Sequence, residues 1–171
     1  GKPVTVLTNV AKNGEVIAPE DRRMVFNTGN QMWHTDSSFK PIPAMMSLLS
    51  GREVPPEGGE TEFASMRAAY EDLDDDQKSE LEQLICVHDF AYSRSLIDTS
   101  LLDREDKYEL PPVRQAMIRK NPTNQRKNLF LGAHASYIEG WPIEKSRILI
   151  ERLNKHITDC KYIYKHSWKR N

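Results

Sequence analysis

The chain has 171 residues, 38% of them hydrophobic and 29% charged, which fits a single domain (residues 1–171) with one sizeable core. Its 24 Lys and Arg balance 25 Asp and Glu to a formal net charge of −1, which excludes a global field that recruits nucleic acid or an anionic membrane. Long apolar runs and a basic-then-apolar leader are absent from the sequence, so we expect no membrane span and no secretion signal. Cys86 and Cys160 lack metal-type spacing, which favours two reduced, packed thiols and a cytoplasmic setting.

Strands are predicted in the first third of the chain. Residues 4–10 are rich in β-branched side chains, and Asn13-Gly14 then gives a strong hairpin signal. Residues 44–54 are predicted to form a mostly buried strand that ends at two prolines. After a Gly-Gly turn, residues 60–64 continue as a strand.

Two short helices and a loop are predicted next. Ser65 is placed as the N-cap of a helix over residues 66–73, and a second helix with acidic residues at its start follows over 75–84. Residues 85–90 return to an extended pattern. Residues 91–110 are polar and irregular, which is typical of a lid or mobile binding loop when it occurs inside a compact domain.

In the last third of the chain, the sequence predicts two strands, the clearest helix of the chain, and a final strand. Residues 113–119 and 128–132 are extended, and Pro142 begins an amphipathic helix over residues 143–157. Residues 161–168 then alternate like a strand. Many short strands with a few outer helices favour a mainly β double-sheet jelly roll over a doubly wound parallel sheet.

The chemistry centres on His34 and Asp36. On a strand, residues two apart point to the same side, so an imidazole and a carboxylate would face one interior together. Such a pair suits a non-haem iron(II) site that a second histidine completes, leaving positions open for co-substrate and oxygen. A His and an Asp at this spacing are common by chance, so the surrounding sequence has to decide.

That surrounding sequence resembles the taurine/2,4-D dioxygenase family. The resemblance rests on residues 33–39 (WHTDSSF), residues 55–63 (PPEGGETEF) and residues 66–70 (MRAAY), in the order and spacing of the family signatures. Residues 128–136 (NLFLGAHAS) look most like the branch that acts on 2,4-D and related aryloxyalkanoates. The resemblance runs from about Thr5 to the end of the chain and implies a double-stranded β-helix.

The resemblance also implies roles for individual residues. His34 and Asp36 would bind iron(II), and the hydroxyl of Thr61 would hold a carboxylate of 2-oxoglutarate. Asn30 falls where the family places a substrate-pocket side chain, and His134 where the aryloxyalkanoate branch has a histidine suspected of meeting the substrate carboxylate. Each of these residues also has a purely structural interpretation. Thr61 would be an ordinary strand residue, Asn30 would form a turn, and His134 would lie at the end of a strand.

The implied reaction is a hydroxylation of a small organic acid by O2 with 2-oxoglutarate as co-substrate, releasing succinate and CO2. An aryloxyalkanoate is the expected substrate, and taurine or another alkyl sulfonate is the alternative, because Asn121-Pro122 stands where the taurine branch commonly has His-Pro. A catalytically inactive jelly-roll binding module is a third interpretation. We expect no nucleic-acid or membrane partner, and homo-oligomerisation stays open.

The sequence departs from the family pattern at its ends. After Trp168-Lys169 the family is expected to continue with G-D-x-x-x-W-D-N-R, the distal iron-binding histidine and the arginine that pairs with 2-oxoglutarate. The remaining histidines, His88, His156 and His166, are expected to be structural. We therefore expect a jelly roll that is incomplete at both ends and that, as this chain alone, binds iron poorly and turns over little.

Overall fold

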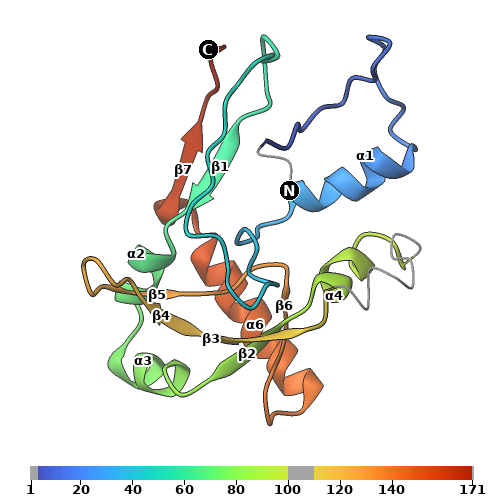
Figure 1. The fold of residues 1–171 in the computed structure, drawn as a ribbon. Helices are drawn as coiled ribbons and strands as arrows, with labels where there is room; N and C mark the ends of the chain where they lie inside the picture. Colours follow the sequence, from blue (N-terminus) through green and yellow to red (C-terminus); the bar gives the residue numbers. More distant parts are fainter. Residues whose placement is uncertain (1–3, 100–109, 171) are drawn as a thin grey trace.

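The computed structural model describes residues 4–99 and 110–170 as small antiparallel sheets with helices around them (Figure 1). One sheet is a narrow arm of two strands, a second has β2 at its centre, and a third is a hairpin. Their members are β1 (Thr61–Ala64) with β7 (Ile163–His166), then β3 (Val113–Ala116), β2 (Ile85–His88) and β6 (Ala135–Ile138), and finally β4 (Ile118–Lys120) with β5 (Lys127–Leu129). Each sheet is open, and the antiparallel class with flanking helices is as expected.

The helices begin at the residues that the sequence marks as caps. The Ser65 side chain accepts from the Ala68 amide, and Asp74 forms a capping box with Gln77. Pro142 precedes the longest helix. The described helices are α1 (Arg22–Asn27), α2 (Met66–Glu71), α3 (Asp75–Leu81), α4 (Phe90–Ser95) and α6 (Ile143–Ile157), with 3-10 turns η1 (Thr28–Gln31) and η3 (Cys160–Tyr162).

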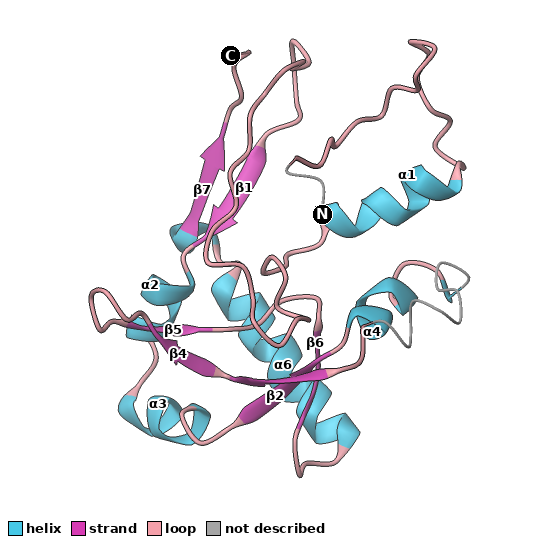
Figure 2. Ribbon diagram, in the orientation of Figure 1, coloured by secondary structure: helices cyan, strands magenta, loops and turns pink. Residues whose placement is uncertain are grey.

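The core lies where α6 packs against β6 and α2 (Figure 2). Leu149, Leu153 and Ile157 form the buried stripe of α6, and they meet Leu131 and Ile138 in one cluster. Each such side chain contributes about 1.5–3 kcal/mol when it leaves water. Among the described residues, no helix combines the length and the apolar character needed to cross a membrane.

Two strands predicted near the N-terminus are wrong. Residues 4–10 form only a single bridge, Val10 to Val16, around the predicted turn at Gly14. Residues 44–54 form no strand and are largely exposed, with Met45 and Leu48 each 90% exposed. The apolar pattern is present, but no neighbouring strand in the described part of the chain pairs with this backbone.

Other predictions need smaller corrections. Residues 91–110 are not one irregular loop, because α4 occupies the beginning, capped by Asp89; residues 100–109 lie outside the described residues. The strand over 113–119 is split at the buried Met117 into β3 and β4. Both cysteines are free thiols, but only Cys86 is packed, and Cys160 is exposed.

Candidate metal site

The segment that carries His34 and Asp36 is a loop, so the predicted strand is wrong here as well. Its first half is fastened to the connection between β5 and β6: the Thr35 hydroxyl donates to the Leu131 carbonyl at 2.8 Å, and the Ala133 amide donates to the Trp33 carbonyl at 2.9 Å. A Cβ added at Gly132 would lie 2.9 Å from the His34 Cα, and Gly132 has φ +125°. Only glycine therefore permits this close approach.

The second half of the loop is fastened to β3. The side-chain amide of buried Gln115 donates to the Ser38 carbonyl at 3.0 Å and to the Lys40 carbonyl at 2.9 Å. Hydrogen bonds to buried backbone carbonyls keep a loop in one conformation, because leaving those groups unpaired is costly. The loop is thus held from two sides without being part of a sheet.

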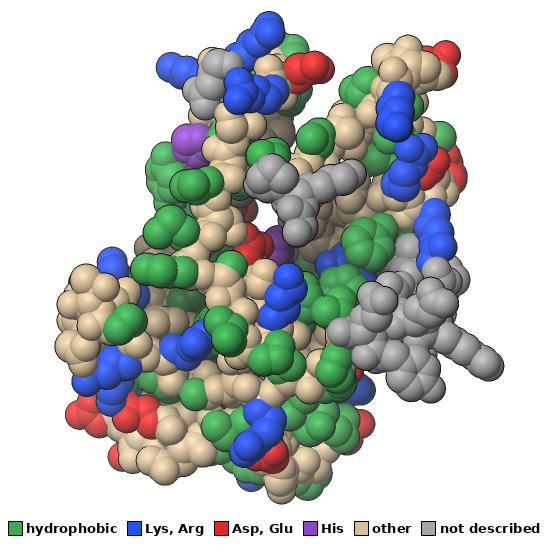
Figure 3. Space-filling view, viewed as in Figure 1, with side chains coloured by type: hydrophobic (Ala, Val, Ile, Leu, Met, Phe, Trp, Pro, Cys, Tyr) green, Lys and Arg blue, Asp and Glu red, His purple; other side chains and the backbone are tan. Residues whose placement is uncertain are grey.

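The loop brings His34 and Asp36 together, as the sequence predicts, although by a different backbone conformation. The His34 Nε2 lies 3.2 Å from the Asp36 Oδ1. On the other side of the ring, Nδ1–H donates to the Met32 carbonyl at 2.7 Å, and the second Asp36 oxygen accepts from the Ser47 hydroxyl. Both side chains are partly exposed, and Figure 3 shows histidine and acidic atoms side by side in the hollow beside the β1–β7 arm.

This arrangement has the donors that a transition metal needs. When Nδ1 carries the proton, Nε2 presents a lone pair toward the carboxylate oxygen, and a histidine that donates its other N–H to a backbone carbonyl is the usual state of a metal ligand. Within residues 4–99 and 110–170, no group of three or more His, Cys, Asp or Glu side chains could hold a metal ion. The described residues thus place two candidate ligand side chains next to each other.

His134 lies behind this pair and is 3% exposed. Its ring centroid is 6.5 Å from that of His34. The Ser93 hydroxyl donates to the Phe90 carbonyl, so the 2.9 Å contact between His134 Nδ1 and Ser93 Oγ is a bond that the imidazole donates. Burial lowers the pKa of His134 to about 3, so the ring is neutral at neutral pH. Its contact with a substrate carboxylate stays a prediction.

Aromatic rings surround His134 and make this side of the site apolar. The Phe39 ring lies 4.8 Å from the His134 ring, and the Phe90 ring lies 6.1 Å from it in a stacked arrangement. The two phenyl rings are themselves 4.8 Å apart. A planar apolar group is the kind of ligand that such a wall accommodates.

Thr61 and Asn30 are not in direct contact with the pair. Thr61 begins β1, opposite His166, and its hydroxyl oxygen accepts a 2.9 Å hydrogen bond from the indole N–H of Trp168. Asn30 lies in η1 and is exposed. Their assigned roles stay predictions.

Sequence reasoning missed several residues that shape the site. Gln115 and Ser47 hold the loop and the carboxylate from distant positions, and Ser93 bonds to His134 from a helix that was predicted to be a loop. A local signal existed only for the helix, because Asp89 is a good N-cap residue.

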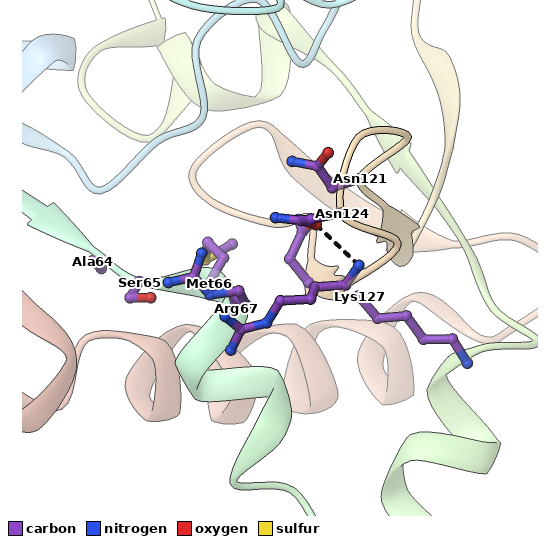
Figure 4. Close-up of a pocket in the computed structure, with 9 residues that line it drawn as sticks. Ala64, Ser65, Met66, Arg67, Asn121, Asn124 and Lys127 are labelled. Carbon is purple, nitrogen blue, oxygen red and sulfur yellow. Dashed lines mark hydrogen bonds between the residues drawn. The ribbon is translucent and has the colours of Figure 1, made fainter.

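A second hollow, of about 290 Å³, lies away from the pair, between the start of α2 and the β4–β5 hairpin (Figure 4). Two of the cations in its lining are already paired: Arg126 with Glu71 and Lys127 with Glu82. Ion pairing of this kind reduces the charge that these two side chains offer to a ligand. This hollow is therefore not the preferred site.

The chain belongs to the family described as taurine catabolism dioxygenase TauD, TfdA family, whose model matches residues 5–171. It is 43% identical over 163 residues to an alpha-ketoglutarate-dependent 2,4-dichlorophenoxyacetate dioxygenase of Burkholderia sp. (strain RASC), a match that covers 95% of this chain and 55% of that protein. The corresponding enzyme of Cupriavidus pinatubonensis is 41% identical over 95% of this chain and 56% of its own length.

A solved structure, AAD-2 in complex with Mn(II) and N-oxalylglycine, superposes with a TM-score of 0.90 at 45% identity. The match covers 95% of this chain and 60% of that chain. The chain thus spans little more than half the length of these relatives.

Proposed function

We propose that this chain is part of an iron(II)- and 2-oxoglutarate-dependent dioxygenase that hydroxylates a small organic acid of the aryloxyalkanoate type. The observation that carries the proposal is the 3.2 Å approach of His34 Nε2 to Asp36 Oδ1, with Nδ1–H committed to a backbone carbonyl. The relatives with 2,4-dichlorophenoxyacetate in their names support the substrate class.

In this proposal His34 and Asp36 hold the metal. Iron(II) with bound 2-oxoglutarate supplies the activation of O2, with succinate and CO2 as the co-products. The protein's own contribution is ligand orientation: the Met32 carbonyl fixes the imidazole, and the Ser47 hydroxyl leaves one Asp36 oxygen for the metal. The aromatic wall around His134 excludes water from the substrate side.

Thr61 is proposed to bind a carboxylate of 2-oxoglutarate. Its oxygen already accepts from Trp168, so its own O–H is available to donate. Asn30 and His134 are proposed to line the substrate side. We further propose that the open sheets are part of a double-stranded β-helix, that residues 1–171 form one domain, and that the protein acts in the cytoplasm; the antiparallel strand pairing supports the first of these.

The test is anaerobic addition of iron(II) and 2-oxoglutarate to the intact protein. The proposal predicts a weak visible charge-transfer band that is lost in His34→Ala and retained in His156→Ala, a matched control whose ring bonds to the Ala69 carbonyl on α2. A band that survives in His34→Ala contradicts the metal assignment. Succinate release across aryloxyacetates, aryloxypropionates and taurine then identifies the substrate class.

A further inference from the structure

Arg94, in the last turn of α4, is a buried cation close to the candidate site. It is 7% exposed, and its guanidinium lies over the rings of Phe26 and Phe90, at 4.7 Å and 4.9 Å from their centroids. The backbone of Gly29 closes a further side, where a Cβ would lie 1.6 Å from Nη1. The charged group therefore occupies a tight slot between α1, η1 and α4.

This cation has no counter-charge within the part of the chain that the structure describes. Its Nη1 donates to the Phe26 carbonyl at 3.0 Å, while its buried Nε meets no acceptor in residues 4–99 and 110–170. Burial lowers the pKa of the Arg94 guanidinium, and no carboxylate among the described residues opposes that shift. An unpaired buried charge is costly, and an apolar side chain would fill the slot at lower cost. We therefore expect Arg94 to have a negatively charged partner that is not among the described residues.

The ring of Phe90 links Arg94 to the site. The Phe90 ring lies against both the Arg94 guanidinium and the His134 ring. The His134 ring in turn lies 6.5 Å from that of His34. Arg94 is thus on the side of the hollow formed by α1 and α4. Thr61, the proposed 2-oxoglutarate ligand, is on the β1–β7 arm at the other side (Figure 1).

We propose that Arg94 supplies the positive charge that selects an anionic substrate at this site, an inference that rests on the proposed function. The imidazole of His134 does not supply it, because the ring is buried and its Nδ1–H is committed to Ser93. At an effective dielectric constant of about 20, a charge that lies roughly 6–8 Å from an anion changes the affinity for that anion about 30- to 100-fold.

The experiment compares two ligands of the same shape. Binding of 2,4-dichlorophenoxyacetate and of its uncharged amide is measured by calorimetry, under nitrogen, to the intact protein loaded with iron(II) and 2-oxoglutarate. We expect Arg94→Gln to weaken binding of the acid about 30- to 100-fold and that of the amide less than about threefold. Arg94→Lys is expected to keep most of the preference for the acid, and 2-oxoglutarate affinity to stay within about threefold.

Each other outcome overturns the inference in a distinguishable way. Equal losses for acid and amide mean that Arg94 only supports the fold, and a selective loss of 2-oxoglutarate affinity means that the charge serves the co-substrate. An acid preference that persists in Arg94→Gln removes Arg94 from the site. Should the glutamine variant unfold, Arg94→Met, whose long apolar side chain fits between the two phenyl rings, provides the same acid-to-amide ratio. If the wild-type protein binds neither compound, the proposed substrate class fails instead.

Discussion

The indole N–H of Trp168 donates a 2.9 Å hydrogen bond to the hydroxyl oxygen of Thr61. The two residues are far apart in sequence and meet because β1 pairs with β7 in antiparallel register, Thr61 opposite His166. A hydroxyl that accepts one hydrogen bond is oriented, and its own proton then points to another acceptor. The Trp168 indole is therefore expected to orient the Thr61 hydroxyl toward a carboxylate.

Replacing Trp168 with Phe tests this orientation. The ring remains apolar, but the donor is lost, and a neutral hydrogen bond of this kind contributes about 0.5–1.5 kcal/mol. We expect the apparent KM for 2-oxoglutarate to rise about 3- to 10-fold, with kcat changed less. Thr61→Ser, which keeps the hydroxyl, is the control. An unchanged KM in Trp168→Phe would show that Thr61 needs no such support.

Gly132→Ala is expected to disturb the metal loop. The added Cβ would lie 2.9 Å from the His34 Cα, at a backbone conformation with φ +125°. We expect a loss of about 1–3 kcal/mol in the free energy of unfolding, together with weaker metal binding. Gly140→Ala is the matched control, because Gly140 also has positive φ but its Cβ would meet nothing within 4 Å. Equal metal affinity in the two variants contradicts the packing argument.

Stability should fall as the pH falls below 6.5, in part because of His88. This buried side chain lies beside Phe130 without a well-directed hydrogen bond among the described residues, and burial lowers its pKa from 6.5 to about 4. The unfolded chain binds the proton more tightly, so the stability due to neutral His88 is present above pH 6.5 and is lost between pH 6.5 and 4. The total is on the order of 3 kcal/mol.

Urea unfolding of the wild-type protein and of His88→Leu across this pH range measures the effect. The variant is expected to show a shallower loss of stability with falling pH, by up to about 1.4 kcal/mol per pH unit. Identical pH dependence in the two proteins would mean that His88 is accessible to protons in the folded state.

Gln115→Leu is expected to loosen the second half of the loop. It leaves the carbonyls of Ser38 and Lys40 without their donor, which costs about 1–3 kcal/mol in unfolding free energy. Its neighbour on β3 provides the control: Arg114 forms an exposed ion pair with Glu139, and Arg114→Leu should cost less than about 1 kcal/mol. Denaturant melts of both variants test the ranking, and the reverse order contradicts it.

Local signals in the sequence predicted α2, α3 and α6, because caps and an apolar stripe are properties of neighbouring residues, whereas α1 was not predicted and α4 was predicted to be part of a loop. Ser65 caps α2, Asp74 caps α3, and the stripe containing Leu153 is buried as α6. Residues 44–54 show the limit: an apolar segment is buried only where another segment covers it, and that depends on distant parts of the chain.

The candidate site, like the fold, was predicted only in part. The proximity of His34 and Asp36 was predicted from a motif, but the loop that carries them is held by Gln115 and Leu131, which carry no local mark of that role. The slot of Arg94 likewise joins α1 to α4 and has no signature within either helix.

The central claim is that His34 and Asp36 grip one metal ion, and diffraction from Mn(II)-soaked crystals of the intact protein tests it most directly. The account predicts an anomalous peak within about 2.0–2.3 Å of both the His34 Nε2 and an Asp36 carboxylate oxygen, with the His34 Nδ1–H still bonded to the Met32 carbonyl. A peak bound elsewhere, or a metal-loaded structure in which the His34 ring turns away from Asp36, would contradict it.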